Sequence, residues 1–150
     1  MTYNQLKKKT EGFTIIEVLI VLAIAGLILL VVFLAVPALQ RNSRNTQRKS
    51  DVQAILGGVQ EFSGNNNGKI PTTAADQTTA ASNVKLGYYD TIAWAAGAQT
   101  ALAATSDTVR VVTGAKCGAA GATVAGSARQ VSVQYLNEGS GALTPACQDS

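Results

Sequence analysis

Three residues near the start of the chain carry groups that could do chemistry together: Gly12, Phe13 and Glu17. Glu17 puts a single carboxyl group at the edge of a long apolar run, where an ionised side chain is costly and suggests a function. If the peptide bond after Gly12 is cut, Phe13 gains a free α-ammonium group. That amine could pair with Glu17 of its own or a neighbouring chain and set the axial register between helices. Simple hydration of Glu17 at a membrane interface is the alternative.

Side chains for enzymatic catalysis are scarce. The sequence has no histidine, which excludes Ser-His-Asp and Cys-His arrangements. No acid/base pair can be recognised among the scattered distal carboxylates, which are expected to be solvated surface charges. They are Asp76, Asp90, Asp107 and Glu138. We therefore expect no enzyme and no cofactor, with a membrane-anchored enzyme as the alternative.

Two cysteines, Cys117 and Cys147, lie in the distal part of the chain. An even pair in an exported segment is typical of one disulfide, which would contribute about 3 to 4 kcal/mol in the chain-entropy model. Two unpaired buried thiols are the alternative. No metal site is expected, because the chain lacks histidine and CxxC spacing.

An apolar run of 22 residues extends from Val18 to Leu39. As a helix it would span about 33 Å, enough to cross the hydrocarbon core of a membrane. Gly26 and Pro37 interrupt the run, and we expect a kink near Pro37 rather than a helix end, because neighbouring segments can absorb such a defect. An ordinary secretory signal is disfavoured, since its apolar core is shorter.

The helix is expected to continue beyond the apolar run and to become amphipathic. Apolar residues then follow at helical spacing, at Val52, Ile55, Leu56, Val59 and Phe62. The glycines at 57 and 58 weaken this part by about 1 kcal/mol each relative to alanine. The cluster of Asn and Gly at 63–68 favours turns, so the helix should end near Phe62.

The distal region predicts a small sheet. Residues 108–113 and 130–136 have strand patterns, and 122–125 could add a weak strand between them. The segment 63–107 is expected to be a connecting region that could hold one short helix, and 137–150 a loop rich in Gly, Pro and Cys. An aromatic group is expected to cover the small core, with an adhesive or stacking patch as the alternative. It consists of Tyr88, Tyr89 and Trp94.

These patterns predict an α+β fold in which one long curved N-terminal helix packs against a small antiparallel sheet. The expected division is a leader at 1–12, a membrane helix at 13–39, an amphipathic continuation at 40–62, a connecting region at 63–107, and a sheet with a disulfide-closed C-terminal loop at 108–150.

The charges argue against a nucleic-acid partner. From residue 63 onward, five basic residues balance five acidic ones, so no broad basic face is expected. Arg41, Arg44, Arg48 and Lys49 follow the apolar run. We expect them to anchor at the membrane interface or to pair with Asp51 and Glu61 of neighbouring chains. Binding of DNA by these residues is the alternative.

The segment KKKTEGFTIIEVLIVLAIAGLILLVV resembles the N-terminal signature of type IV prepilins and of the related pseudopilins of type II secretion. The resemblance covers roughly residues 5 to 40. It implies cleavage between Gly12 and Phe13 by a prepilin peptidase on the cytoplasmic face, and N-methylation of Phe13. It also implies assembly by an ATPase and a platform protein into a helical homo-oligomer, with Glu17 contacting the Phe13 amine of a neighbour.

The resemblance further implies a function and a location. The chain would be a pilin of a type IV pilus-like filament, with a pseudopilin, or a minor pilin that binds DNA or surfaces, as alternatives. The precursor would cross the inner membrane once with its N-terminus in the cytoplasm, and the assembled pilus would be extracellular and could serve adhesion or twitching motility. Gly26 falls where the family often has glycine, whereas Pro37 lies a few residues later than the family's usual proline.

Two details of the distal region also bear on the resemblance. Cys117 and Cys147 look like the disulfide that closes a C-terminal loop in many pilins. Major pseudopilins commonly bind calcium there, but residues 137–150 offer only the carboxylates of Glu138 and Asp149, which favours a true pilin.

Overall fold

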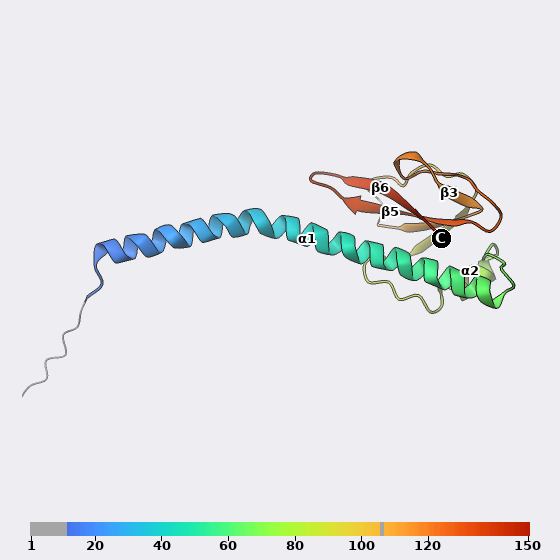
Figure 1. Ribbon diagram of the computed structural model, residues 1–150, viewed down its shortest axis with the longest axis horizontal. Coiled ribbons are helices and arrows are strands. Elements are labelled where there is room, and N and C mark those ends of the chain that lie inside the picture. The colour runs from blue at the N-terminus through green and yellow to red at the C-terminus, as the bar shows by residue number, and fades with distance from the viewer. Residues whose placement is uncertain (1–11, 106) are drawn as a thin grey trace, which may run out of the picture. The chain divides into compact units, whose positions relative to one another are not determined.

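The computed structural model describes residues 12–105 and 107–150 of the chain (Figure 1). The predicted leader therefore lies outside the described residues, apart from Gly12. Two compact units divide between Leu39 and Gln40. One helix, α1 (Ile15–Asn65), contributes to both units, as the sequence predicts. The helix includes Gly26 and Pro37, and the kink expected there stays a prediction.

The second unit contains a four-stranded sheet with the order β1-β2-β5-β6. Its strands are β1 (Ile92–Ala96), β2 (Val109–Thr113), β5 (Val131–Glu138) and β6 (Leu143–Asp149). A two-stranded sheet joins β3 (Ala115–Cys117) to β4 (Thr123–Ala125), with the short 3-10 helix η1 (Ala119–Gly121) between them, and a short helix, α2 (Ala74–Ala81), follows α1. The α+β class predicted from the sequence is confirmed.

Three details of the sheet differ from the sequence prediction. β1 lies inside the segment expected to connect helix and sheet, and it pairs parallel to β2, so the sheet is mixed rather than purely antiparallel. The C-terminal segment expected to be a loop instead forms the end of β5 and the whole of β6. Pro145 is tolerated within β6 because this strand lies at an edge of the sheet, where a missing amide hydrogen need not break a ladder.

The core lies between the amphipathic half of α1 and one face of the sheet. The predicted apolar stripe supplies Val52, Ile55, Leu56 and Val59, and the sheet supplies alternate residues of β2 and β5. Those residues are Val109, Val111, Val131, Val133 and Tyr135. Because strand side chains alternate between faces, the residues between them point away from the helix. Gln134, for example, donates to the carbonyls of Thr100 and Gly121 on the opposite face.

At Gly58, α1 packs closely against the end of α2 and the residues after it. A Cβ atom placed on Gly58 would lie 2.6 Å from the carbonyl oxygen of Ala80 and 2.6 Å from Cγ2 of Val84. A Cβ on the adjacent Gly57 would meet no atom within 4 Å. The two neighbouring glycines therefore have different roles, and only Gly58 is required by packing.

Replacing Gly58 by alanine is expected to lower the free energy of unfolding by about 2 kcal/mol, because the backbone of α2 must move to admit the methyl group. Gly57→Ala is the matched control and should raise it by up to about 1 kcal/mol, since alanine is the better helix former. The measurement is urea unfolding of the full chain in detergent, followed by the fluorescence of Trp94. Equal effects of the two substitutions would contradict the role of Gly58.

Candidate assembly site

Thr14 and Glu17 bind each other at the start of α1. The amide and hydroxyl groups of Thr14 donate to Oε2 of Glu17 at 2.8 and 2.7 Å, and the amide of Glu17 donates to the Thr14 hydroxyl oxygen at 3.3 Å. This reciprocal pattern is a capping box, which satisfies amide groups that have no partner within the helix. It explains why the helix begins at Ile15 and gives Glu17 a partner in the uncut chain. The Thr-x-x-Glu spacing in the sequence could have revealed it.

Gly12 and Phe13 precede the helix and are exposed to solvent. Phe13 has 89% of its surface accessible, and a Cβ on Gly12 would meet no atom within 4 Å. The peptide bond between them is therefore outside regular structure and uncovered by the described part of the chain. This is the conformation in which a protease can bind the backbone of a substrate. The roles predicted for both residues stay predictions.

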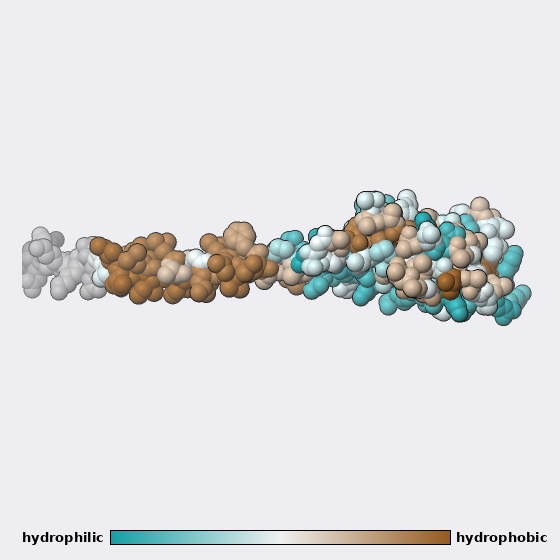
Figure 2. Space-filling view, turned by 90° about the horizontal axis from the view of Figure 1, so that it is seen from above, coloured by the Kyte–Doolittle hydropathy of each residue, from teal (hydrophilic) through white to brown (hydrophobic). Residues whose placement is uncertain are grey.

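Beyond Glu17, the described part of the first unit has an almost entirely apolar surface. Large hydrophobic side chains with 40% or more of their surface accessible follow one another from Phe13 to Leu39. Figure 2 shows this part of the helix as a nearly unbroken brown surface. Among the described residues, α1 alone is long and apolar enough to cross a membrane. A surface of this kind requires lipid or other apolar helices to cover it.

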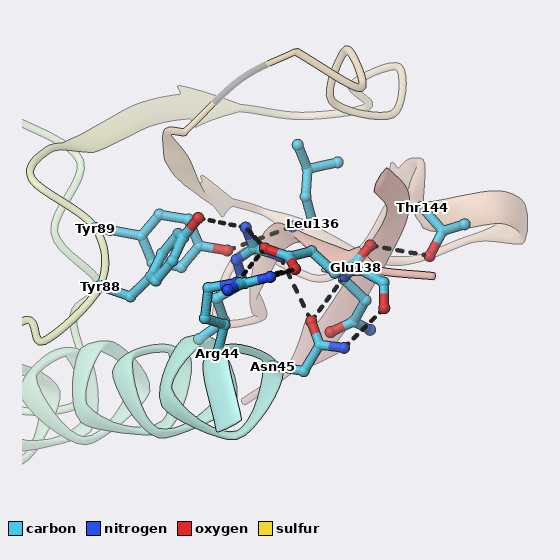
Figure 3. Close-up of polar contacts among 9 residues, drawn as sticks. Arg44, Asn45, Tyr88, Tyr89, Leu136, Glu138 and Thr144 are labelled. Atoms are coloured by element: carbon cyan, nitrogen blue, oxygen red, sulfur yellow. Dashed lines mark hydrogen bonds and ion pairs between the residues drawn. The ribbon is translucent and has the colours of Figure 1, made fainter. Parts of the chain in front are cut away.

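Two of the arginines that follow the apolar run, Arg44 and Arg48, lie in a polar cluster (Figure 3). Nε of Arg44 donates to both carboxylate oxygens of Glu138 at 2.9 Å, and its Nη2 lies 2.6 Å from Oε2. Nη2 of the buried Arg48 lies 3.0 Å from Oε1 of Glu138. Glu138 is therefore an ion-pair partner and not the solvated charge that the sequence suggested.

Asn45 and Tyr88 complete this cluster. The side chain of Asn45 donates to the backbone carbonyl of Glu138 at 2.9 Å and accepts from its backbone amide at 2.7 Å. These are the two backbone groups that a neighbouring strand would otherwise pair with. Tyr88 accepts a hydrogen bond from Arg48, whose guanidinium carbon lies 4.2 Å from the centre of the Tyr88 ring. The cluster joins the first polar turns of α1 in the second unit to the end of β5.

Asp51 holds the loop that carries Tyr88. Its carboxylate accepts hydrogen bonds from three successive amides, those of Gly87 at 2.9 Å, Tyr88 at 2.7 Å and Tyr89 at 3.1 Å. Asp51 is buried within its own chain, which corrects the expectation that it pairs with arginines of neighbouring chains. Tyr89 is buried in the core and Trp94 packs against it, so core covering, the expected use of these aromatic residues, is confirmed for both.

The predicted disulfide between Cys117 and Cys147 is confirmed, with Cα atoms 5.6 Å apart. It joins β3 to β6, and Oδ1 of Asp149 accepts a hydrogen bond from the Cys117 amide at 2.7 Å. The two sulfur atoms and a carboxylate oxygen of Asp149 lie within 4.8 Å of one another. Because both sulfur atoms are consumed by the disulfide, they provide no thiolate ligands for a metal ion.

The comparisons with known proteins match the N-terminal segment. A family model described as "Prokaryotic N-terminal methylation motif" matches residues 7–33. No match was found among curated proteins or among solved structures. The matched residues include Gly12, Phe13 and Glu17, as well as much of the exposed apolar helix. Together with that helix the motif fits a membrane-anchored precursor and indicates a structural subunit. The chain therefore carries the N-terminal signature of type IV pilins and pseudopilins.

Proposed function

We propose that this chain is the precursor of a pilin, a structural subunit of a type IV pilus-like filament. A prepilin peptidase cuts the bond between Gly12 and Phe13 at the cytoplasmic face of the inner membrane, and the new Phe13 amine is methylated. A platform protein and an ATPase then assemble the mature subunits into an extracellular helical homo-oligomer. The observation that supports this proposal most directly is the exposed apolar helix that begins two residues after Phe13.

Cleavage changes the electrostatic state of Glu17. In the uncut chain its carboxylate accepts hydrogen bonds from Thr14, which satisfy the oxygen atom without neutralising the charge. A free α-ammonium group at Phe13 supplies the missing positive charge, and in a low-dielectric bundle this pairing strongly favours one register of neighbouring helices. The same carboxylate thus caps its own helix before cleavage and directs assembly afterwards.

The apolar surface of α1 supplies the cohesion of the filament. Within the membrane, lipid covers this surface as well as another helix would, so packing and polar contacts decide which helices associate. Outside the membrane the same surface would face water, where burial of apolar area gives about 25 cal/mol per Å². The filament is therefore held together by the surface that kept each precursor in the membrane.

The contacts of two carboxylates support a pilin over a pseudopilin. Glu138 is bound by Arg44 and Arg48, and Asp149 is bound by the Cys117 amide. Both carboxylates of the C-terminal segment thus have partners within the chain. A calcium site of the pseudopilin kind would have to displace these partners.

The experiment is N-terminal peptide and intact mass spectrometry on filaments sheared from cells that produce the chain. We expect a mature chain that begins at Phe13 and carries one methyl group on its amine. A Glu17→Gln variant should show the same start in the membrane fraction, but its yield in the sheared fraction should fall by about tenfold or more, because the ion pair is lost.

Other outcomes would contradict the proposal. A mature start beyond Pro37 would indicate a secreted domain, and an uncut chain confined to membranes would indicate a simple anchor. Normal filament yield from Glu17→Gln would show that the carboxylate does not direct assembly.

A further inference from the structure

An open groove of about 550 Å³ lies beside the polar cluster in the second unit. It is lined by Arg41 of α1 and by the turn between β5 and β6, where Gly139, Gly141 and Ala142 occupy little space. Asp107 also lines the groove, from the segment that leads into β2. The groove therefore brings together residues from three separate parts of the unit.

Four charged side chains line the groove, those of Arg41, Arg48, Asp107 and Glu138. Glu138 is already bound by Arg44 and Arg48. No ion pair or hydrogen bond joins the side chain of Arg41 or of Asp107 to another residue in the described part of the chain. The groove also borders the buried Arg48, whose Nε has no hydrogen-bond partner there. An occupant that matches these groups would carry both a negative and a positive charge.

The position of Arg41 in the chain indicates where such an occupant would come from. Arg41 follows Leu39, the last residue of the apolar run, by two positions. When the apolar run is in a membrane, Arg41 lies at the level of the lipid headgroups, where guanidinium groups bind phosphate. The phosphate of a lipid is then the nearest abundant anion.

We propose that this groove binds the headgroup of a zwitterionic aminophospholipid, phosphatidylethanolamine, while the chain is anchored in the membrane. Arg41 pairs with the phosphate and Asp107 with the primary ammonium group. A choline headgroup has the same charges but cannot donate hydrogen bonds to Asp107, and a glycerol headgroup lacks the cation. The proposal rests on the membrane location of α1 and not on filament assembly.

The test is native mass spectrometry of the full chain in detergent, titrated with phosphatidylethanolamine, phosphatidylcholine or phosphatidylglycerol of the same acyl chains. We expect phosphatidylethanolamine to be retained about two- to fivefold more than either other lipid, the range for one exposed ion pair. Arg41→Gln should weaken the retention of all three lipids, because each carries the phosphate that Arg41 binds. Asp107→Asn should remove only the preference for phosphatidylethanolamine. Lys49→Gln, at an exposed cation outside the groove, is the matched control and should change nothing.

Three outcomes would overturn the proposal. Equal retention of the three lipids would mean that the groove does not distinguish their headgroups. Equal lipid retention by Arg41→Gln and Lys49→Gln would mean that Arg41 does not bind the phosphate. Displacement of the lipid by soluble phosphoethanolamine at equal concentration would point to a free ligand instead. None of these outcomes depends on where the chain is cut, so the proposed function is tested separately by its N-terminus.

Discussion

Replacing Asp51 by alanine is expected to lower the free energy of unfolding of the full chain by about 3 kcal/mol. The substitution leaves three successive amides without their acceptor, those of Gly87, Tyr88 and Tyr89. The amide of Tyr89 is buried beside the buried Asp51, where water does not easily replace the carboxylate. Chemical unfolding in detergent measures the difference.

Two further variants test whether the effect comes from these hydrogen bonds. Asp51→Asn keeps one acceptor oxygen and loses the charge, so its effect should lie between those of the native chain and Asp51→Ala. Asp90→Ala removes an exposed carboxylate and should cost less than about 0.5 kcal/mol. If Asp51→Ala behaved like Asp90→Ala, the loop would be held by something other than Asp51.

Glu138→Gln is expected to lower the free energy of unfolding by about 2 kcal/mol at pH 7, because the buried Arg48 loses its counter-charge. It should also change the response to acid. Hydrogen bonds from Arg44 lower the pKa of Glu138 below its ordinary value of 4.5, partial burial opposes this, and the charge of Arg48 adds to it.

The sign of the pH effect follows from the lowered pKa. The folded state holds the carboxylate form more tightly than the unfolded state does, so the contribution is fully present above about pH 4.5 and is lost as the pH falls through the folded pKa. Between pH 7 and pH 3 the native chain should therefore lose about 1 kcal/mol more than Glu138→Gln. Glu61→Gln replaces an exposed acid and should lose as much free energy of unfolding over this pH range as the native chain does. If the free energy of unfolding fell equally with pH in the native chain and in Glu138→Gln, the ion pair of Glu138 would not be the cause of the acid sensitivity.

The helix and two strands could be predicted because local patterns determine them. The apolar run and the stripe from Val52 to Phe62 have helical spacing, and the segments that became β2 and β5 alternate or are β-branched. β1 has the sequence IAWAA, which alternates weakly, and its place in the sheet comes from parallel pairing with β2. β6 was obscured by Pro145 and Cys147, which are typical of loops.

The polar cluster could not be predicted, because its members are far apart in the chain. Arg44 and Glu138 are separated by 94 residues, and no local pattern indicates which of the scattered acids a given arginine will meet. The capping box of Thr14 and Glu17 differs, since its spacing is visible in the sequence. It was missed because the Phe13 amine offered another partner for the same carboxylate.

The place of β5 in the sheet has a consequence for the order in which the domain can form. β5 lies between β2 and β6 and supplies both Val131 and Val133 of the core, yet it is made after most of the chain. While the ribosome makes the intervening segment, the apolar stripe of α1 lacks its principal cover and Arg48 lacks its counter-ion. The nascent subunit therefore stays unfinished until β5 and β6 emerge, and any truncation before Val131 leaves the apolar stripe of α1 without the core residues of β5.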